Sequence, residues 1–141
     1  MNGDFAMGLD ATVFRNVRNI AQNASSSIEV DELTGQPLVA SNSGLDMIAA
    51  EVRLGNIAEI ARIRETIERM IGAKKSFILN RVVYSGTHVG DVVRVNELYL
   101  LSSDLDYLTK FDTNNSLQDF IASMRLLIQT ARAESNPIVF C

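Results

Sequence analysis

The chain has 141 residues, of which 47% are hydrophobic and 21% are charged, so it is long enough to bury one continuous core and predicts a single domain. Its 13 basic residues against 17 acidic residues give a formal net charge of −4, which argues against a dedicated nucleic-acid-binding protein. No apolar run is long enough to cross a bilayer, no signal peptide is evident, and the single cysteine, Cys141, excludes an intramolecular disulfide and a cysteine-cluster metal site.

The first forty residues predict a strand and a hairpin. Residues 1–6 are expected to form a flexible extension ahead of one domain that covers residues 7–141. In 8–17, apolar and polar residues alternate with a period of two, which predicts a strand. The same alternation in 28–40 is interrupted by turn-forming residues that include Gly35, which predicts a hairpin.

The next segment could be one long helix or a strand followed by a helix. Residues 48–54 alternate with strand periodicity, and Asn56 is a good residue to cap a helix at its N-terminus. In 57–71 the isoleucines fall on one helical face, and Gly72 follows as a terminator. These signals favour a strand followed by a helix.

The second half of the chain predicts one buried strand, two helices and a terminal strand. Residues 76–84 are apolar and β-prone, which predicts a central strand. Helical periodicity then follows in 96–110 and in 116–134, and 138–140 reads as a short strand. The fold class that we expect is α+β, with a mostly antiparallel sheet of five or six strands and three main helices packed on it.

Charge is unevenly distributed along the predicted helices. Basic residues outnumber acidic ones between positions 56 and 75, whereas between 97 and 119 five acidic residues face a single lysine, Lys110. Two interpretations are open: solvated helix surfaces, or an acidic face that attracts a cationic partner. The acidic residues that would face such a partner are Glu97, Asp104, Asp106 and Asp112.

The loop 85–91 is the one site-like feature of the sequence. It follows the most hydrophobic segment and contains the only histidine, and its candidate binding groups are Ser85, Thr87, His88 and Asp91. These neighbours lack the spacing of a catalytic triad, of a complete metal site and of a phosphate-binding motif. The sequence therefore favours a rigid turn-rich connection that can also serve as a recognition surface.

Three segments resemble a group of small bacterial proteins related to the immunity proteins of polymorphic toxin systems. They are Met-Gly-Leu-Asp at 7–10, Val-Val-Tyr-Ser-Gly-Thr-His-Val-Gly-Asp at 82–91, and Asn-Pro-Ile-Val-Phe at 136–140. The resemblance implies a compact α+β protein that protects its producer by binding a cognate toxin. It implies no catalysis, and no catalytic residue is carried over from it.

The sequence thus predicts a cytoplasmic binding protein, without a cofactor or metal, that inhibits a basic toxin and contacts neither nucleic acid nor membrane. An alternative is a small hydrolase or ligand-binding enzyme organised around the loop 85–91. A third hypothesis is a homo-oligomeric structural protein.

Overall fold

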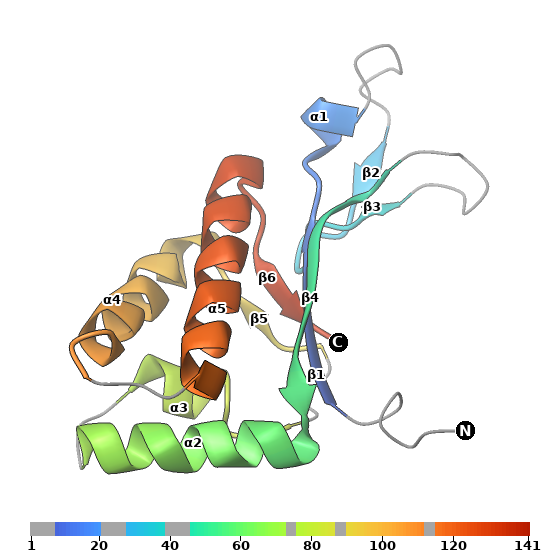
Figure 1. Ribbon diagram of the computed structural model, residues 1–141. Coiled ribbons are helices and arrows are strands. Elements are labelled where there is room, and N and C mark those ends of the chain that lie inside the picture. The colour runs from blue at the N-terminus through green and yellow to red at the C-terminus, as the bar shows by residue number, and fades with distance from the viewer. Residues whose placement is uncertain (1–7, 21–27, 39–45, 73–75, 87–89, 112–114) are drawn as a thin grey trace, which may run out of the picture.

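The computed structural model describes residues 8–20, 28–38, 46–72, 76–86, 90–111 and 115–141 (Figure 1). Four strands form an antiparallel sheet in the order β4-β1-β6-β5, and their bounds are β1 Gly8–Phe14, β4 Ile48–Asn56, β5 Val92–Val93 and β6 Ile138–Phe140. A separate two-stranded hairpin consists of β2 Glu29–Val30 and β3 Pro37–Leu38. The helices are α1 Val17–Ile20, α2 Ile57–Ile71, α3 Phe77–Arg81, α4 Leu98–Leu108 and α5 Asn115–Glu134, with a 3₁₀ turn, η2, at Val95–Glu97.

The described residues confirm an α+β fold with antiparallel pairing, but the prediction of one sheet with five or six strands is wrong. The main sheet has four strands, and the other two strands form the separate hairpin. The long helices α2 and α5 pack on the sheet and α4 packs on α5, whereas the hairpin lies on the other side of the sheet (Figure 1). The predicted extension at residues 1–6 lies outside the described residues.

The strand predicted at 76–84 is replaced by the short helix α3 and an irregular segment. The Ser76 hydroxyl oxygen accepts a hydrogen bond from the Leu79 amide at 3.2 Å. Asp104, on α4, accepts bonds from the Ser76 hydroxyl at 3.0 Å and from the Ile78 amide at 3.1 Å. These side chains satisfy the amides at the start of the helix, so a contact distant in sequence overrides the local preference for a strand.

Helix α2 confirms the prediction of a strand followed by a helix. The Glu59 amide donates to the Asn56 side chain at 2.8 Å, and the Asn56 amide donates to the Glu59 carboxylate at 2.9 Å. At the other end the Gly72 amide donates to the Glu68 carbonyl at 3.0 Å. Both helix ends are therefore specified by residues within the segment itself.

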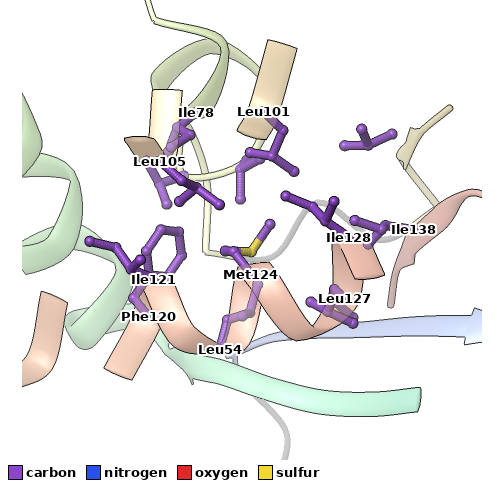
Figure 2. Packing of buried hydrophobic residues seen from close by; sticks show 14 of the residues in the cluster. Leu54, Ile78, Leu101, Leu105, Phe120, Ile121, Met124, Leu127, Ile128 and Ile138 are labelled. Atoms are coloured by element: carbon purple, nitrogen blue, oxygen red, sulfur yellow. The ribbon is translucent and has the colours of Figure 1, made fainter. Parts of the chain in front are cut away.

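The core lies between the sheet and the helices, and α5 runs through its centre. Figure 2 shows Met124, Leu127 and Ile128 of α5 among side chains from the sheet, α3 and α4. The apolar faces expected in 96–110 and 116–134 are confirmed as the buried faces of α4 and α5, although α4 begins after the 3₁₀ turn. None of the helices in the described ranges combines the length and apolar character needed to span a membrane.

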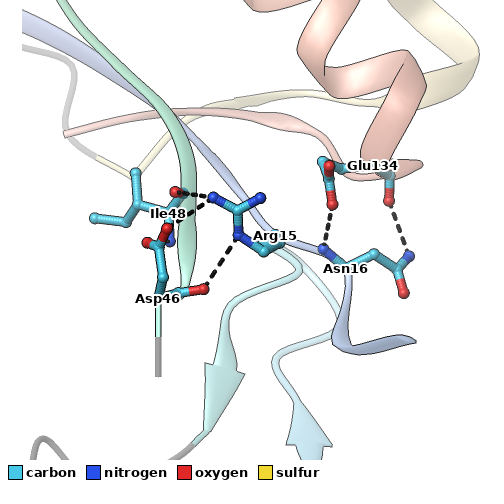
Figure 3. A network of polar contacts seen from close by, with 5 residues as sticks. All are labelled: Arg15, Asn16, Asp46, Ile48 and Glu134. Atoms are coloured by element: carbon cyan, nitrogen blue, oxygen red, sulfur yellow. Dashed lines mark hydrogen bonds and ion pairs between the residues drawn. The ribbon is translucent and has the colours of Figure 1, made fainter. Parts of the chain in front are cut away.

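Polar contacts fix the ends of β1, β4 and α5 relative to one another (Figure 3). Arg15 pairs with the Asp46 carboxylate at 2.8 Å and donates to the Ile48 carbonyl at 3.1 Å. The Asn16 amide donates to the Glu134 carboxylate at 2.8 Å, and the Asn16 side chain donates to the Glu134 carbonyl at the same distance. This end of the sheet carries the hairpin described below.

Candidate interaction site at the hairpin and the 85–91 loop

An ion pair between Arg81 and Glu97 lies at the centre of this region. The guanidinium of Arg81, at the end of α3, donates to both carboxylate oxygens of Glu97 at 2.8 and 3.1 Å and to the Val92 carbonyl at 3.1 Å. Glu97 also accepts the Arg94 amide at 3.0 Å. The hydrogen bond between the pair lowers the pKa of Glu97 and raises the pKa of Arg81 above its ordinary value. Together these bonds join α3, β5 and η2.

The loop 85–91 is anchored at both of its ends. At its start, Gly86 packs against α2, where a Cβ would lie 3.1 Å from the Ile57 Cα, so a larger residue would require a small shift of the neighbouring backbone. At its end, the Gly90 amide donates to the Phe140 carbonyl at 2.7 Å, and the Phe140 amide donates to the Asp91 carbonyl at 2.9 Å. These bonds tie the end of the loop to β6.

Tyr84 and Asp91 meet across the loop. The Tyr84 hydroxyl donates a hydrogen bond to the Asp91 carboxylate. This bond raises the pKa of Tyr84, because ionisation of the hydroxyl would break it. Both residues are exposed and line an open groove of about 560 Å³ together with Arg81 and Glu97.

The turn of the hairpin projects Leu33 over the same groove. The Asp31 carboxylate accepts hydrogen bonds from the Leu33 amide at 2.9 Å and the Thr34 amide at 3.0 Å. Gly35 has a φ of 77° and packs directly on the Asn136 side chain. The turn is thus held by its own side chains and by the segment between α5 and β6, while Leu33 remains 52% exposed.

A second groove of about 550 Å³ adjoins the first, and Leu33 and Arg94 line both grooves. We call the lining of these two grooves the hairpin surface. Its exposed apolar side chains are Val30, Leu33, Tyr84 and Val95. Its charged residues are four acidic ones, Asp31, Glu32, Asp91 and Glu97, and two basic ones, Arg81 and Arg94. The surface therefore combines exposed apolar groups with a net negative charge.

The candidate groups of the 85–91 loop are only partly brought together. Ser85 is half-buried and Asp91 is exposed beside Tyr84, whereas Thr87 and His88 lie outside the described residues. Within the ranges that the structure describes, no group of three or more histidine, cysteine, aspartate or glutamate side chains is arranged to hold a metal ion. Of the two candidates that the structure describes, Asp91 lines the hairpin surface and Ser85 does not.

The acidic candidates differ in the exposure of their carboxylates and in the groups of the chain that these carboxylates contact. Glu97 is 23% exposed in its ion pair with Arg81, and Asp104 is bound to the start of α3. Asp106 is 67% exposed and contacts Arg125 at 3.0 Å, and Asp112 lies outside the described residues. Glu97 and Asp104 therefore stabilise the fold, and Asp106 is the most open of the three that the structure describes.

No family model, curated protein or solved structure matches this chain. The geometry of the chain itself is therefore the basis for a functional proposal.

Sequence reasoning identified the loop and Glu97 but missed Leu33, Tyr84 and Arg81 as parts of the same region. Arg81 and Tyr84 fell within the predicted central strand. A signal for α3 was present in Ser76, which is a favourable N-cap residue directly before the first residue of that helix. The sequence did not specify whether Leu33 is exposed, because Leu33 lies in the turn, out of phase with the alternating Ile28, Val30 and Leu38.

Proposed function

We propose that the chain is a cytoplasmic binding protein without catalytic activity, an immunity-type inhibitor that covers a basic surface of a cognate bacterial toxin. The observation that carries the proposal is Leu33, an exposed apolar side chain held by a tethered turn between two grooves with an excess of carboxylates. The resemblance of segments 7–10, 82–91 and 136–140 to proteins related to immunity proteins supports the same class.

The hairpin surface has the composition of a recognition site. Apolar side chains that bury well at the centre of an interface, here Leu33 and Tyr84, lie among charged groups that select a partner by sign. The turn is already ordered by the Asp31 carboxylate and by Asn136, so little conformational entropy would be lost on binding. Four carboxylates against two guanidinium groups favour a partner with a basic surface.

The test is co-expression with a candidate toxin chosen from the genes next to its own, followed by measurement of binding between the purified proteins. Wild-type chain is expected to protect the cells and to form a one-to-one complex whose affinity falls as salt rises. Leu33→Asp is expected to weaken the complex at least tenfold, because it places a charge at the centre of the contact.

Leu126→Asp is the matched control, because Leu126 is 49% exposed on α5 and lines neither groove. This variant is expected to bind and to protect like wild type. Absence of both protection and complex with the wild-type chain would overturn the proposed function. Equal binding by the two variants would remove the hairpin surface from the proposal while leaving the inhibitor class intact.

A further inference from the structure

Strand β4 forms one edge of the four-stranded sheet, and it is much longer than the strand at the other edge. It has nine residues, whereas β5 has two. Among the described residues β4 pairs only with β1, and Figure 1 shows it lying in front of β1. A long edge strand offers backbone donors and acceptors to an incoming strand.

The sequence of β4 is complementary to itself when two copies run antiparallel. Val52 lies between Glu51 and Arg53, and both charged side chains are exposed. If Val52 of one copy lies opposite Val52 of another, Glu51 of each copy lies opposite Arg53 of the other. Opposite charges that face each other across antiparallel strands stabilise the pairing, and this register creates two such pairs.

We propose that two copies of this chain associate through antiparallel pairing of their β4 strands, in the register centred on Val52. The two four-stranded sheets would then form one continuous sheet of eight strands across the interface. This inference is independent of the proposed inhibitor function, because β4 contributes nothing to the lining of the hairpin surface.

The ends of β4 fit the same register. In this register Ile48 of one copy lies opposite Asn56 of the other copy. Ile57, the first residue of α2, directly follows that Asn56. Ile48 and Ile57 are both exposed, so the pairing brings an apolar side chain toward an apolar side chain at each end of the interface. Burial of these two contacts adds a hydrophobic contribution to the backbone pairing.

The regular part of β4 also contains the proposed centre. The pairing with β1 is continuous from Ala50 to Arg53, and its register shifts lie outside these residues. Arg53 contacts Asp10 at 3.4 Å within its own chain and its guanidinium lies over Gly8 of β1, so the cross-strand pair forms when this side chain turns toward the outer edge of β4. The short regular segment predicts a weak dimer whose population depends on concentration.

Sedimentation equilibrium of the full chain, from micromolar to millimolar concentration, tests the proposal. Wild type is expected to shift from its monomer mass of 15.5 kDa toward twice that mass. Glu51→Arg places two arginines opposite each other at both pairs, and Arg53→Glu does the same with two glutamates. Each variant alone is therefore expected to remain monomeric over the whole range.

An equal mixture of the two variants distinguishes this interface from any other. Glu51→Arg chains carry only arginine at these two positions and Arg53→Glu chains carry only glutamate, so the mixture is expected to form heterodimers. A fold defect in either variant would not be repaired by mixing, and circular dichroism of each variant alone checks for one. A monomeric wild type at millimolar concentration, or dimers that persist in the single variants, would overturn the proposal.

Discussion

Asp104 lies on α4 but stabilises the start of α3. Its carboxylate accepts one hydrogen bond from the Ser76 hydroxyl and one from the Ile78 amide. Ser76 and Ile78 are both buried, so water cannot readily replace the lost acceptor. The substitution Asp104→Ala is therefore expected to destabilise the fold and not only to change the surface charge.

The magnitude follows from the two hydrogen bonds. A hydrogen bond to a charged group contributes about 1.5–3 kcal/mol, and the half-exposed position of Asp104 reduces this to about 1 kcal/mol for each bond. We expect Asp104→Ala to lower the free energy of unfolding by about 2 kcal/mol, which corresponds to a fall in Tm of about 4–8 °C for a chain of this size.

Asp106→Ala is the control, since Asp106 lies on the same helix and its pair with Arg125 is exposed. Replacement of either aspartate by alanine changes the helix propensity by the same amount, so the difference between the variants reports the contacts. Urea unfolding followed by circular dichroism is expected to show Asp106→Ala within about 0.5 kcal/mol of wild type. Equal unfolding midpoints for the two variants would refute the role assigned to Asp104.

Two further substitutions test the site. Glu97→Gln removes the charge paired with Arg81 and is expected to cost about 1 kcal/mol near neutral pH. Because the folded pKa of Glu97 lies below its ordinary value of 4.5, wild type gains stability above that value and loses it as the pH falls through the folded pKa. The urea midpoints of wild type and Glu97→Gln should therefore differ at neutral pH and converge at strongly acidic pH. A difference between the two proteins that persists in acid would contradict the ion pair. Gly35→Ala should destabilise the chain more than Gly72→Ala in the same assay, because both glycines have a positive φ but only a Cβ at Gly35 would collide with Asn136. Equal losses would show that the contact with Asn136 does not restrain the turn.

The elements that could be predicted from sequence are those whose ends are specified locally. Helix α2 is the clearest case, because Asn56 caps it from the residue before its first turn and Gly72 ends it. Helices α4 and α5 were predictable from their apolar stripes, since each buries one face against the same core. The hairpin was predictable because its turn carries Gly35 at a positive φ.

The segment at 76–84 carries one local signal for a helix, the N-cap residue Ser76, but its other residues favour a strand. Its apolar side chains predict a buried strand, and several of them, including Ile78, Val82 and Val83, are in fact buried. What decides its backbone is an acceptor 26 residues later in the chain, the Asp104 carboxylate. Burial was thus predictable from composition, whereas the conformation depended on a contact that forms only in the folded protein.

The same limit applies to the candidate site. The sequence marked Glu97 as a partner-facing acid, yet most of its hydrogen-bonding capacity is taken by Arg81 and the Arg94 amide. A count of charges along the chain cannot distinguish a carboxylate that neutralises a neighbouring cation from one that attracts a partner. That distinction requires the positions of α3 and η2 relative to each other.

The hairpin surface draws its rigidity from the sheet and not from the hairpin alone. A hairpin in which two strands pair over only two residues each is too short to be stable by itself. Its turn packs on Asn136, whose side chain donates to the Phe14 carbonyl of β1 at 2.8 Å. The order of Leu33 is therefore coupled to β1, a central strand of the sheet, so destabilisation at the end of β1 would weaken partner binding without touching the partner.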